Sequence, residues 1–402
     1  MKMVKGVRCV AVVILMFGII FLIDSSVMAA DRVGNEPAAT AASGSPIKIG
    51  ALIAYTGPDP LMLEIDKGIK LKLDEVGWKV ANRSIELRTE DYAAKAATAV
   101  DKARKLVELD KVNVVIGPVV VDCLMAAINF ITPYKIPQLT LATLPLAGLK
   151  MGGNNVFSFV GEQKGVTQYT GVYAWEAGFK TASVIHQDFV AGAVFADGFI
   201  EAYEAKGGKV VQRQRIPIGT MDYAPYVTAM DKADCVVSWL LPQETLRFLP
   251  RYYDSKLRMP FIQMYASFPD VMLNDVGPRA EGIISIHRWC MALDNPLNKK
   301  FVADFVKKYQ VEPHYLAAAA YEATSIILAA LEATGGETDP AVLNDAIGKV
   351  KIDLPSGMTS FTKNRVGIGD LNIIKAVNKN GKIVWSPLKT YRQVTYLAPA
   401  SK

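Results

Sequence analysis

Segments that resemble strands and segments that resemble helices alternate along most of this chain. Residues 47–53 form an almost entirely apolar strand-like run, and apolar residues at helical spacing follow over 61–76, where Gly77 provides a stop. The alternation continues with strands expected at 85–89, 112–116 and 137–141 and helices at 93–109 and 123–131. This spacing predicts right-handed βαβ units, and therefore a parallel sheet covered by helices on both faces.

A second series of the same layout begins near Val166. Strands are expected at 182–186, 210–216, 235–240, 261–264 and 283–286, with helices at 168–177, 190–205, 223–230 and 244–253 between them. Helices at 297–309, 315–334 and 340–350 follow, and then a hairpin at 371–385 with Asn380-Gly381 as its turn. The chain is therefore predicted to form two doubly wound α/β lobes. Ligands of such sheets bind beyond the carboxyl ends of the strands, which predicts a site in the cleft between the lobes.

The first residues have the pattern of an export signal. Lys2, Lys5 and Arg8 precede an apolar run at 9–23, and the small residues of Val27-Met28-Ala29-Ala30 follow. We predict a signal peptide at 1–29 and a flexible N-terminus at 30–46, which is rich in Ala, Gly, Ser and Pro. The apolar run is shorter than the ~20 residues of a membrane-spanning helix, although an uncleaved anchor remains the alternative. A periplasmic or extracellular location follows from this prediction.

Composition argues against several classes of function. The net charge of +6 is spread along the chain, and no basic stripe interleaved with aromatic residues indicates a nucleic-acid partner. Cys123, Cys235 and Cys290 show no metal-ligand spacing, so buried thiols are expected, although one disulfide among them remains possible. The sequence contains no dinucleotide fingerprint after the first strand, no Walker loop, no Gly-x-Ser-x-Gly elbow and no His-Glu-x-x-His. We therefore predict no metal, no cofactor and no enzymatic activity.

The order of several short motifs resembles the periplasmic solute-binding proteins of ATP-driven importers, in the branched-chain amino-acid (leucine/isoleucine/valine-binding) family. The resemblance covers residues 47–385. It is carried by Ile47-Lys48-Ile49-Gly50, Thr56-Gly57-Pro58, the run 112–118, Asp188 with Gly192, Glu281-Gly282 and the run 319–323.

This resemblance implies a type I Venus-flytrap fold with crossovers near Gly161, His287 and Gly367. Lobe 1 would comprise 47–161 with 287–367, and lobe 2 would comprise 162–286 with 368–398. A small-molecule ligand would close the cleft, and the closed form, a monomer, would dock on a membrane permease. A ligand-sensing receptor module of the same fold is the alternative function, and an α/β enzyme is a weaker one.

The expected ligand-binding loops depart from the pattern of this family. Members that bind leucine-like amino acids hold the carboxylate with Ser/Thr hydroxyls and backbone N–H groups after strands three and four. Here Val121 and Asp122 follow the third strand without those hydroxyls, whereas Thr140, Ala142 and Thr143 follow the fourth. The acidic partner for the ammonium is also missing, although Asp122 could replace it or could simply be a hydrated loop carboxylate.

Aromatic residues are expected on the second lobe's side of the cleft. Phe189, Trp239 and Tyr265 stand where they could line a pocket, although Trp239 could equally belong to the core. Tyr55 and Thr56 follow the first strand and are added as candidates, with a turn-forming role for Thr56 left open. We therefore predict a small carboxylate or amide with an apolar or aromatic body, and a branched-chain amino acid remains open. His186 is expected to end a strand that faces the cleft, where a structural role is favoured.

Overall fold

The first sheet of the protein is built from residues 47–157. The computed structural model describes residues 44–57, 60–265 and 270–398, so the predicted signal peptide and most of the predicted flexible segment lie outside the described residues. The strand order is β2-β3-β1-β4-β5-β6. The bounds are β1 Ile47–Ile53, β2 Lys79–Val80, β3 Arg83–Asp91, β4 Val114–Ile116, β5 Gln138–Leu139 and β6 Val156–Phe157. All pairs are parallel except β2 with β3, and β1 lies between β3 and β4, as in a doubly wound lobe.

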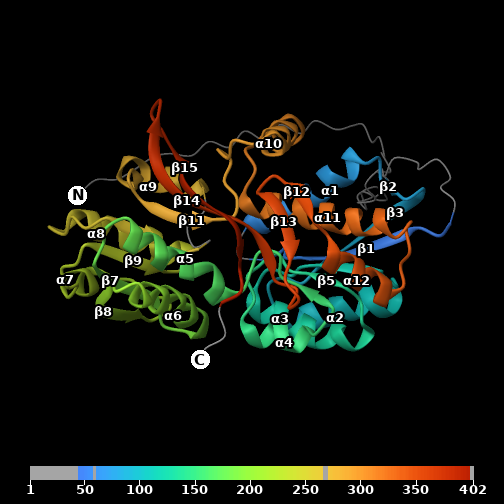
Figure 1. The fold of residues 1–402 in the computed structure, drawn as a ribbon, viewed down its shortest axis with the longest axis horizontal. Helices are drawn as coiled ribbons and strands as arrows, with labels where there is room; N and C mark the ends of the chain where they lie inside the picture. The colour runs from blue at the N-terminus through green and yellow to red at the C-terminus, as the bar shows by residue number, and fades with distance from the viewer. Residues whose placement is uncertain (1–43, 58–59, 266–269, 399–402) are drawn as a thin grey trace, which may run out of the picture. The chain divides into compact units, whose positions relative to one another are not determined.

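Helices cover both faces of this sheet (Figure 1). One face packs against α1 (Leu63–Glu75), α11 (Tyr315–Ala333) and α12 (Pro340–Lys349), and the other against α2 (Ala96–Arg104) and α3 (Val121–Ile131). Alternate side chains of a strand point to opposite faces, so Ile49 and Ile53 join the first cluster while Leu52 joins the second. The near-continuous apolar character of β1 is explained by this burial on both sides.

The helix predicted at 93–109 differs from the structure at both ends. Ala93 and Ala94 have φ values of 49° and 53°, a left-handed conformation that excludes them from a right-handed helix. The α-helix therefore begins at Ala96. Its last turn, Lys105–Leu109, is π-helical.

The second sheet has nine strands in the order β8-β7-β9-β10-β11-β14-β13-β12, with β15 also paired to β14. The strands from β8 to β11 are parallel, and those from β14 onward are antiparallel. The strand bounds are β7 Thr181–Gln187, β8 Lys209–Ile216, β9 Cys235–Trp239, β10 Phe261–Gln263, β11 Ile284–His287, β12 Ile352–Leu354, β13 Gly357–Phe361, β14 Gly367–Lys379 and β15 Lys382–Thr395. The helices that follow or flank them are α5 Gln163–Glu176, α6 Val190–Ala205, α7 Ala224–Thr228, α8 Pro242–Asp254, α9 Asp270–Val276 and α10 Pro296–Tyr309. The first strand of the series, β7, again lies between the second and the third, which confirms two doubly wound lobes.

The C-terminal hairpin is longer than predicted. Strands β14 and β15 pair from Ile368 with Thr395 to Lys379 with Lys382, beyond both ends of the range 371–385. The predicted turn is confirmed, because Asn380 and Gly381 both have positive φ, at 53° and 86°. The short helices α4 (Leu146–Gly152) and α9 and the short strands β2, β6, β12 and β13 were not predicted.

Two crossover segments meet beside Gly161. Ser158 forms an isolated parallel bridge with Val366, and the Gly161 N–H donates to the carbonyl of Ser158. Gly161 has φ of 113°, and a Cβ at this position would lie 2.5 Å from the side chain of Val166 and 2.9 Å from that of Tyr396. Glycine is required at this crossover for both reasons.

The thiols and the most apolar helix belong to the interior. Cys123, Cys235 and Cys290 are all buried and no disulfide joins them, which confirms the prediction of buried thiols. Within the described ranges α11 is the one helix long and apolar enough to cross a membrane, and 83% of its most apolar window is buried in the protein. That burial is expected of a core helix. The same ranges contain no group of three or more His, Cys, Asp or Glu side chains that could hold a metal ion.

Candidate functional site

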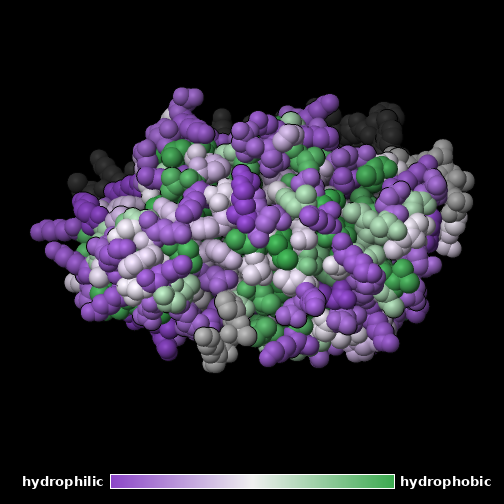
Figure 2. Space-filling model, viewed as in Figure 1, coloured by the Kyte–Doolittle hydropathy of each residue, from purple (hydrophilic) through white to green (hydrophobic). Residues whose placement is uncertain are grey.

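A cavity of about 630 Å³ lies at the carboxyl ends of parallel strands from both sheets. Its lining follows β4 and β5 in the first sheet and β7, β9, β10 and β11 in the second, with one face of α11 completing it. This is the position where open α/β sheets bind ligands. Figure 2 shows a mainly hydrophilic surface with a group of hydrophobic atoms near the middle of the face shown.

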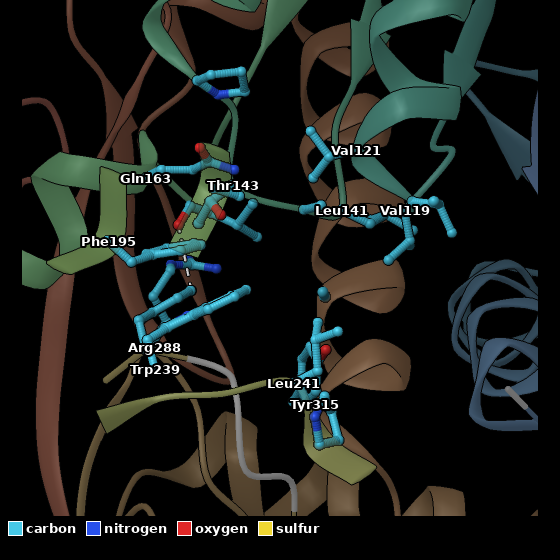
Figure 3. Close-up of a pocket in the computed structure, with 18 of the residues that line it drawn as sticks. Val119, Val121, Leu141, Thr143, Gln163, Phe195, Trp239, Leu241, Arg288 and Tyr315 are labelled. Atoms are coloured by element: carbon cyan, nitrogen blue, oxygen red, sulfur yellow. Dashed lines mark hydrogen bonds between the residues drawn. The ribbon is translucent and has the colours of Figure 1, made fainter. Parts of the chain in front are cut away.

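One wall of the cavity is aromatic. Trp239 ends β9, and its ring stacks on Phe195 of α6 with centroids 4.5 Å apart and an interplanar angle of 15°. Phe189 adds a tilted ring 5.7 Å from Trp239. Figure 3 shows Phe195 and Trp239 on one side of the cavity and the aliphatic side chains of Val119 and Leu141 on the other. A flat apolar body between these surfaces would be enclosed on both faces.

Four helix N-termini border the cavity without a side-chain cap: those of α3, α4, α6 and α8. By contrast, side chains of Glu162, Asn295, His314 and Asp339 cap α5, α10, α11 and α12. Asp122 and Glu244 lie in the first turns of α3 and α8 and offset part of their positive potential, whereas the first turn of α6 carries no acidic residue. Its N–H groups at Val190 and Ala191 therefore form an anion-binding position beside the aromatic wall.

A buried ion pair also borders the cavity. Arg288 follows β11 and donates to Glu322 of α11 at 3.1 Å, with side-chain exposures of 4% and 1%. The second terminal nitrogen of Arg288 donates to the hydroxyls of Ser356 and Thr359, and the remaining oxygen of Glu322 accepts the N–H of Ser356. Each charge is thus neutralised within the protein. Neither side chain therefore offers a full charge to a ligand, and Arg288 does not act as an unpaired arginine that would bind a carboxylate directly.

Three buried polar atoms in the cavity lining have no hydrogen-bond partner within the described part of the chain. They are Nε1 of Trp239, Nε2 of His287 and Nε of Arg288. Burial lowers the pKa of His287 to about 4, so its ring is neutral at pH 7. A buried polar group without a partner costs about 1–3 kcal/mol, so these atoms are the ones that a ligand can most favourably contact.

Seven of the ten predicted ligand-binding residues line this one cavity. They are Val121, Asp122, Ala142, Thr143, Phe189, Trp239 and Tyr265. Asp122 is exposed, Thr143 is buried, and Tyr265 donates its hydroxyl hydrogen to the carbonyl of Val160. The two loops after β4 and β5 and the three aromatic residues of the second lobe are therefore brought together by the fold.

The remaining three candidates, and His186, lie outside the lining and hold local structure. Tyr55 donates to Asp66 at 2.9 Å, and Thr56 donates to Asp91 at 2.5 Å. Thr140 is fully buried and donates to the carbonyl of Ala142 at 3.0 Å. His186 does not line the cavity, and its ring is buried and accepts a hydrogen bond from Arg213, which agrees with the structural role favoured for it.

Polar residues of the crossover and of α11 line the cavity without having been predicted. Tyr315, Ala319 and Glu322 occupy positions i, i+4 and i+7 of α11, so they share the helix face that lines the cavity. A glutamate inside such an apolar helix was the available signal. His287, Arg288, Phe195 and Gln163 also line the cavity, and nothing local in the sequence marks them.

Comparisons with known proteins agree with this architecture. A family model described as "Periplasmic binding protein" matches residues 46–382. The Leu/Ile/Val-binding protein homolog 6 of Brucella suis biovar 1 is 26% identical over 334 residues, covering 81% of this chain and 85% of the relative.

Two solved structures share the fold over most of their length. An ABC transporter substrate-binding protein from Sphaerobacter thermophilus has a TM-score of 0.83 and 24% identity, covering 88% of this chain and 100% of that protein. A solute-binding protein of an ABC transporter from Rhodopseudomonas palustris HaA2, in complex with p-hydroxybenzoic acid, has a TM-score of 0.80 and 23% identity, covering 88% and 98%.

Proposed function

This chain belongs to the periplasmic binding protein family, and on that premise we propose that it is the substrate-binding component of an ABC importer that captures a small aromatic carboxylate. The family is one of periplasmic binding proteins of transporters, which supports a binding role rather than an enzymatic one and supports a periplasmic location. The observation that carries the proposed ligand is the stacked pair of Phe195 and Trp239 beside the uncapped N-terminus of α6. The rings suit a flat apolar body, and the N–H groups suit its carboxylate.

The charges in the cavity disfavour an amino-acid ligand. A buried ammonium requires a carboxylate or several carbonyl oxygens. Glu322 is the buried acid in the lining, and both of its oxygens are engaged by Arg288 and Ser356. The second candidate is a branched-chain amino acid. It is favoured by the exposed carboxylate of Asp122 in the cavity lining, which could pair with an ammonium group, and by the name of the Brucella relative. The Rhodopseudomonas protein with p-hydroxybenzoic acid supports the aromatic class.

The proposed transport function also gives roles to the N-terminal segment and to the two lobes. In our proposal, residues 1–29 direct export, and the lobes comprise 47–161 with 287–367 and 162–286 with 368–398. The monomer closes on its ligand and delivers it unchanged to a membrane permease. Of the ten candidates, the seven that line the cavity would contact the ligand, whereas Tyr55, Thr56 and Thr140 would stabilise the loops.

Isothermal titration of the protein lacking residues 1–29 tests this proposal. Benzoate should bind at one site, while leucine should bind at least tenfold more weakly. Replacing Trp239→Phe keeps the stacked ring but removes Nε1–H, and the affinity for benzoate should fall about two- to tenfold. Trp175→Phe is the matched control, because Trp175 lies on α5 outside the cavity lining, and its affinity should not change. Tighter binding of leucine than of benzoate would contradict the aromatic assignment.

A further inference from the structure

We infer that His287 makes the cavity selective for aromatic carboxylates that carry a hydroxyl group on the ring, by hydrogen-bonding that hydroxyl at the end of the cavity farther from Trp239. This inference rests on the proposed function and specifies its substrate class. It is carried by the order of side chains along the edge of the second sheet and by the unpartnered Nε2 atom of His287.

The strand order sets the two ends of the site. Trp239 ends β9, Tyr265 follows β10 and His287 ends β11, and these three strands are consecutive neighbours in the sheet. Adjacent strands lie about 4.8 Å apart, so the ends of β9 and β11 are separated by roughly 10 Å. That span suits a benzene ring with a polar group at each end. The ring of Tyr265 stands between the two ends, 6.0 Å from the ring of His287.

The two ends of the cavity differ in their chemistry. Trp239 contacts Phe195 and Phe189, at the N-terminus of α6, where the carboxylate is placed by the positive helix end. In Figure 3, Thr143 and Gln163 appear above this aromatic pair, Arg288 appears beside it, and Tyr315 appears lower on the opposite side of the cavity, near Leu241. His287 lies at the Tyr315 end, with ring centroids 6.4 Å apart. Because Arg288 is already paired with Glu322, it does not offer a free positive charge to a second carboxylate.

A neutral hydroxyl is the group that His287 can recognise. Its side chain is 5% exposed, and burial keeps the ring neutral at pH 7. A neutral imidazole nitrogen either donates or accepts, depending on the tautomer. A phenolic hydroxyl does both, so it can bond to Nε2 in either tautomer, and Nε of Arg288 is a further unpartnered donor in the lining. A methyl group at the same ring position would leave these atoms without a partner.

Titration of the exported form with benzoate, 3-hydroxybenzoate, 4-hydroxybenzoate and 4-methylbenzoate tests the inference. One hydroxybenzoate should bind about two- to tenfold more tightly than benzoate, and 4-methylbenzoate, which matches the hydroxyl in size, should not show this gain. In His287→Phe the preference for a hydroxybenzoate over benzoate should disappear. The control is His186→Gln, since His186 is also a buried histidine near the end of a parallel strand but lies outside the lining.

The outcomes separate this inference from the proposed function. If benzoate binds and no hydroxybenzoate is preferred, the role of His287 is wrong and the aromatic carboxylate assignment stands. The same conclusion follows if His287→Phe or, where that variant does not fold, His287→Gln keeps the full preference. If none of the four carboxylates binds, the proposed ligand class and this inference are both wrong.

Discussion

At the scale of single residues, the site depends on a charge pair that the ligand need not touch. Arg288 and Glu322 are buried, and the guanidinium also lies 4.9 Å from the ring of Phe159 and 5.5 Å from that of Tyr396. The hydrogen bonds to Ser356 and Thr359 connect the crossover after β11 to the β12–β13 hairpin. The pair therefore stabilises the side of the cavity where His287 lies.

Removing one member of this pair should be costly. Glu322→Gln preserves the shape of the side chain but leaves the charge of Arg288 without its partner, so we expect a loss of about 3–5 kcal/mol in the free energy of unfolding. Urea denaturation followed by circular dichroism measures this loss. Asp345→Asn is the matched control, because Asp345 pairs with Lys349 on the surface, with 63% and 75% of the side chains exposed. It should cost less than about 1 kcal/mol, and equal losses in the two variants would contradict the argument.

At the scale of elements, the first residue of α6 is exposed and its helix N-terminus has no side-chain cap. Phe189 occupies the N-cap in an extended conformation and supplies no capping side chain. Val190 follows it, lines the cavity and is 80% exposed. A helix start of this kind is less stable than a capped one, and it leaves N–H groups available to a ligand anion.

A negative charge added at this helix end should raise the stability of the protein but weaken its binding of benzoate. Val190→Asp places a negative charge where the helix dipole favours it, so the protein should gain about 0.3–1 kcal/mol of stability. The same charge should repel a ligand carboxylate and weaken benzoate binding by roughly tenfold, which corresponds to about 1.4 kcal/mol. Thermal denaturation and titration calorimetry measure the two effects. Val190→Asn, neutral and of similar shape, should bind benzoate within about threefold of the unmodified protein. Unchanged affinity in the aspartate variant would place the carboxylate elsewhere.

At the scale of the whole molecule, buried histidines should make the fold sensitive to mild acid. Burial lowers the pKa of His287 to about 4, and burial together with the nearby His287 lowers that of His314 to about 3. An unfolded chain protonates both rings below pH 6.5, whereas the folded protein does not until these lower values. The stability they confer is therefore fully present above pH 6.5 and is lost as the pH falls toward 4.

This pH dependence can be measured by urea denaturation at pH 7, 6 and 5. Each histidine should contribute up to about 1.4 kcal/mol per pH unit below 6.5, so the free energy of unfolding should fall by a few kcal/mol over this range. Glu162 acts in the opposite direction, since burial raises the pKa of its carboxyl group. In His287→Phe the slope between pH 6 and pH 5 should be shallower but not zero, because burial also lowers the pKa of His314 and of His186. A stability that does not change between pH 7 and pH 5 would show that neither ring is held neutral by the fold.

The sequence by itself determined most of the helices and strands and the order in which they alternate. Apolar residues at spacings of two and of 3.6 mark most strands and helices, and alternation of the two predicts doubly wound lobes. Asn380-Gly381 marked the hairpin turn for the same local reason, because positive φ is a property of the residues themselves. Residues at or shortly beyond the carboxyl ends of strands, such as Trp239 and Thr143, were found in this way.

Only the tertiary structure decided which polar groups face the cavity. Arg288 and Glu322 are 34 positions apart and meet because a crossover lies against α11. Thr140 and Thr143 stand in one loop, yet Thr140 bonds internally and Thr143 lines the cavity. Local periodicity shows which residues form a helix or strand and which of its faces is apolar. It does not show which residue of a distant segment will contact a given polar side chain. The chemistry of the site is therefore set by long-range packing.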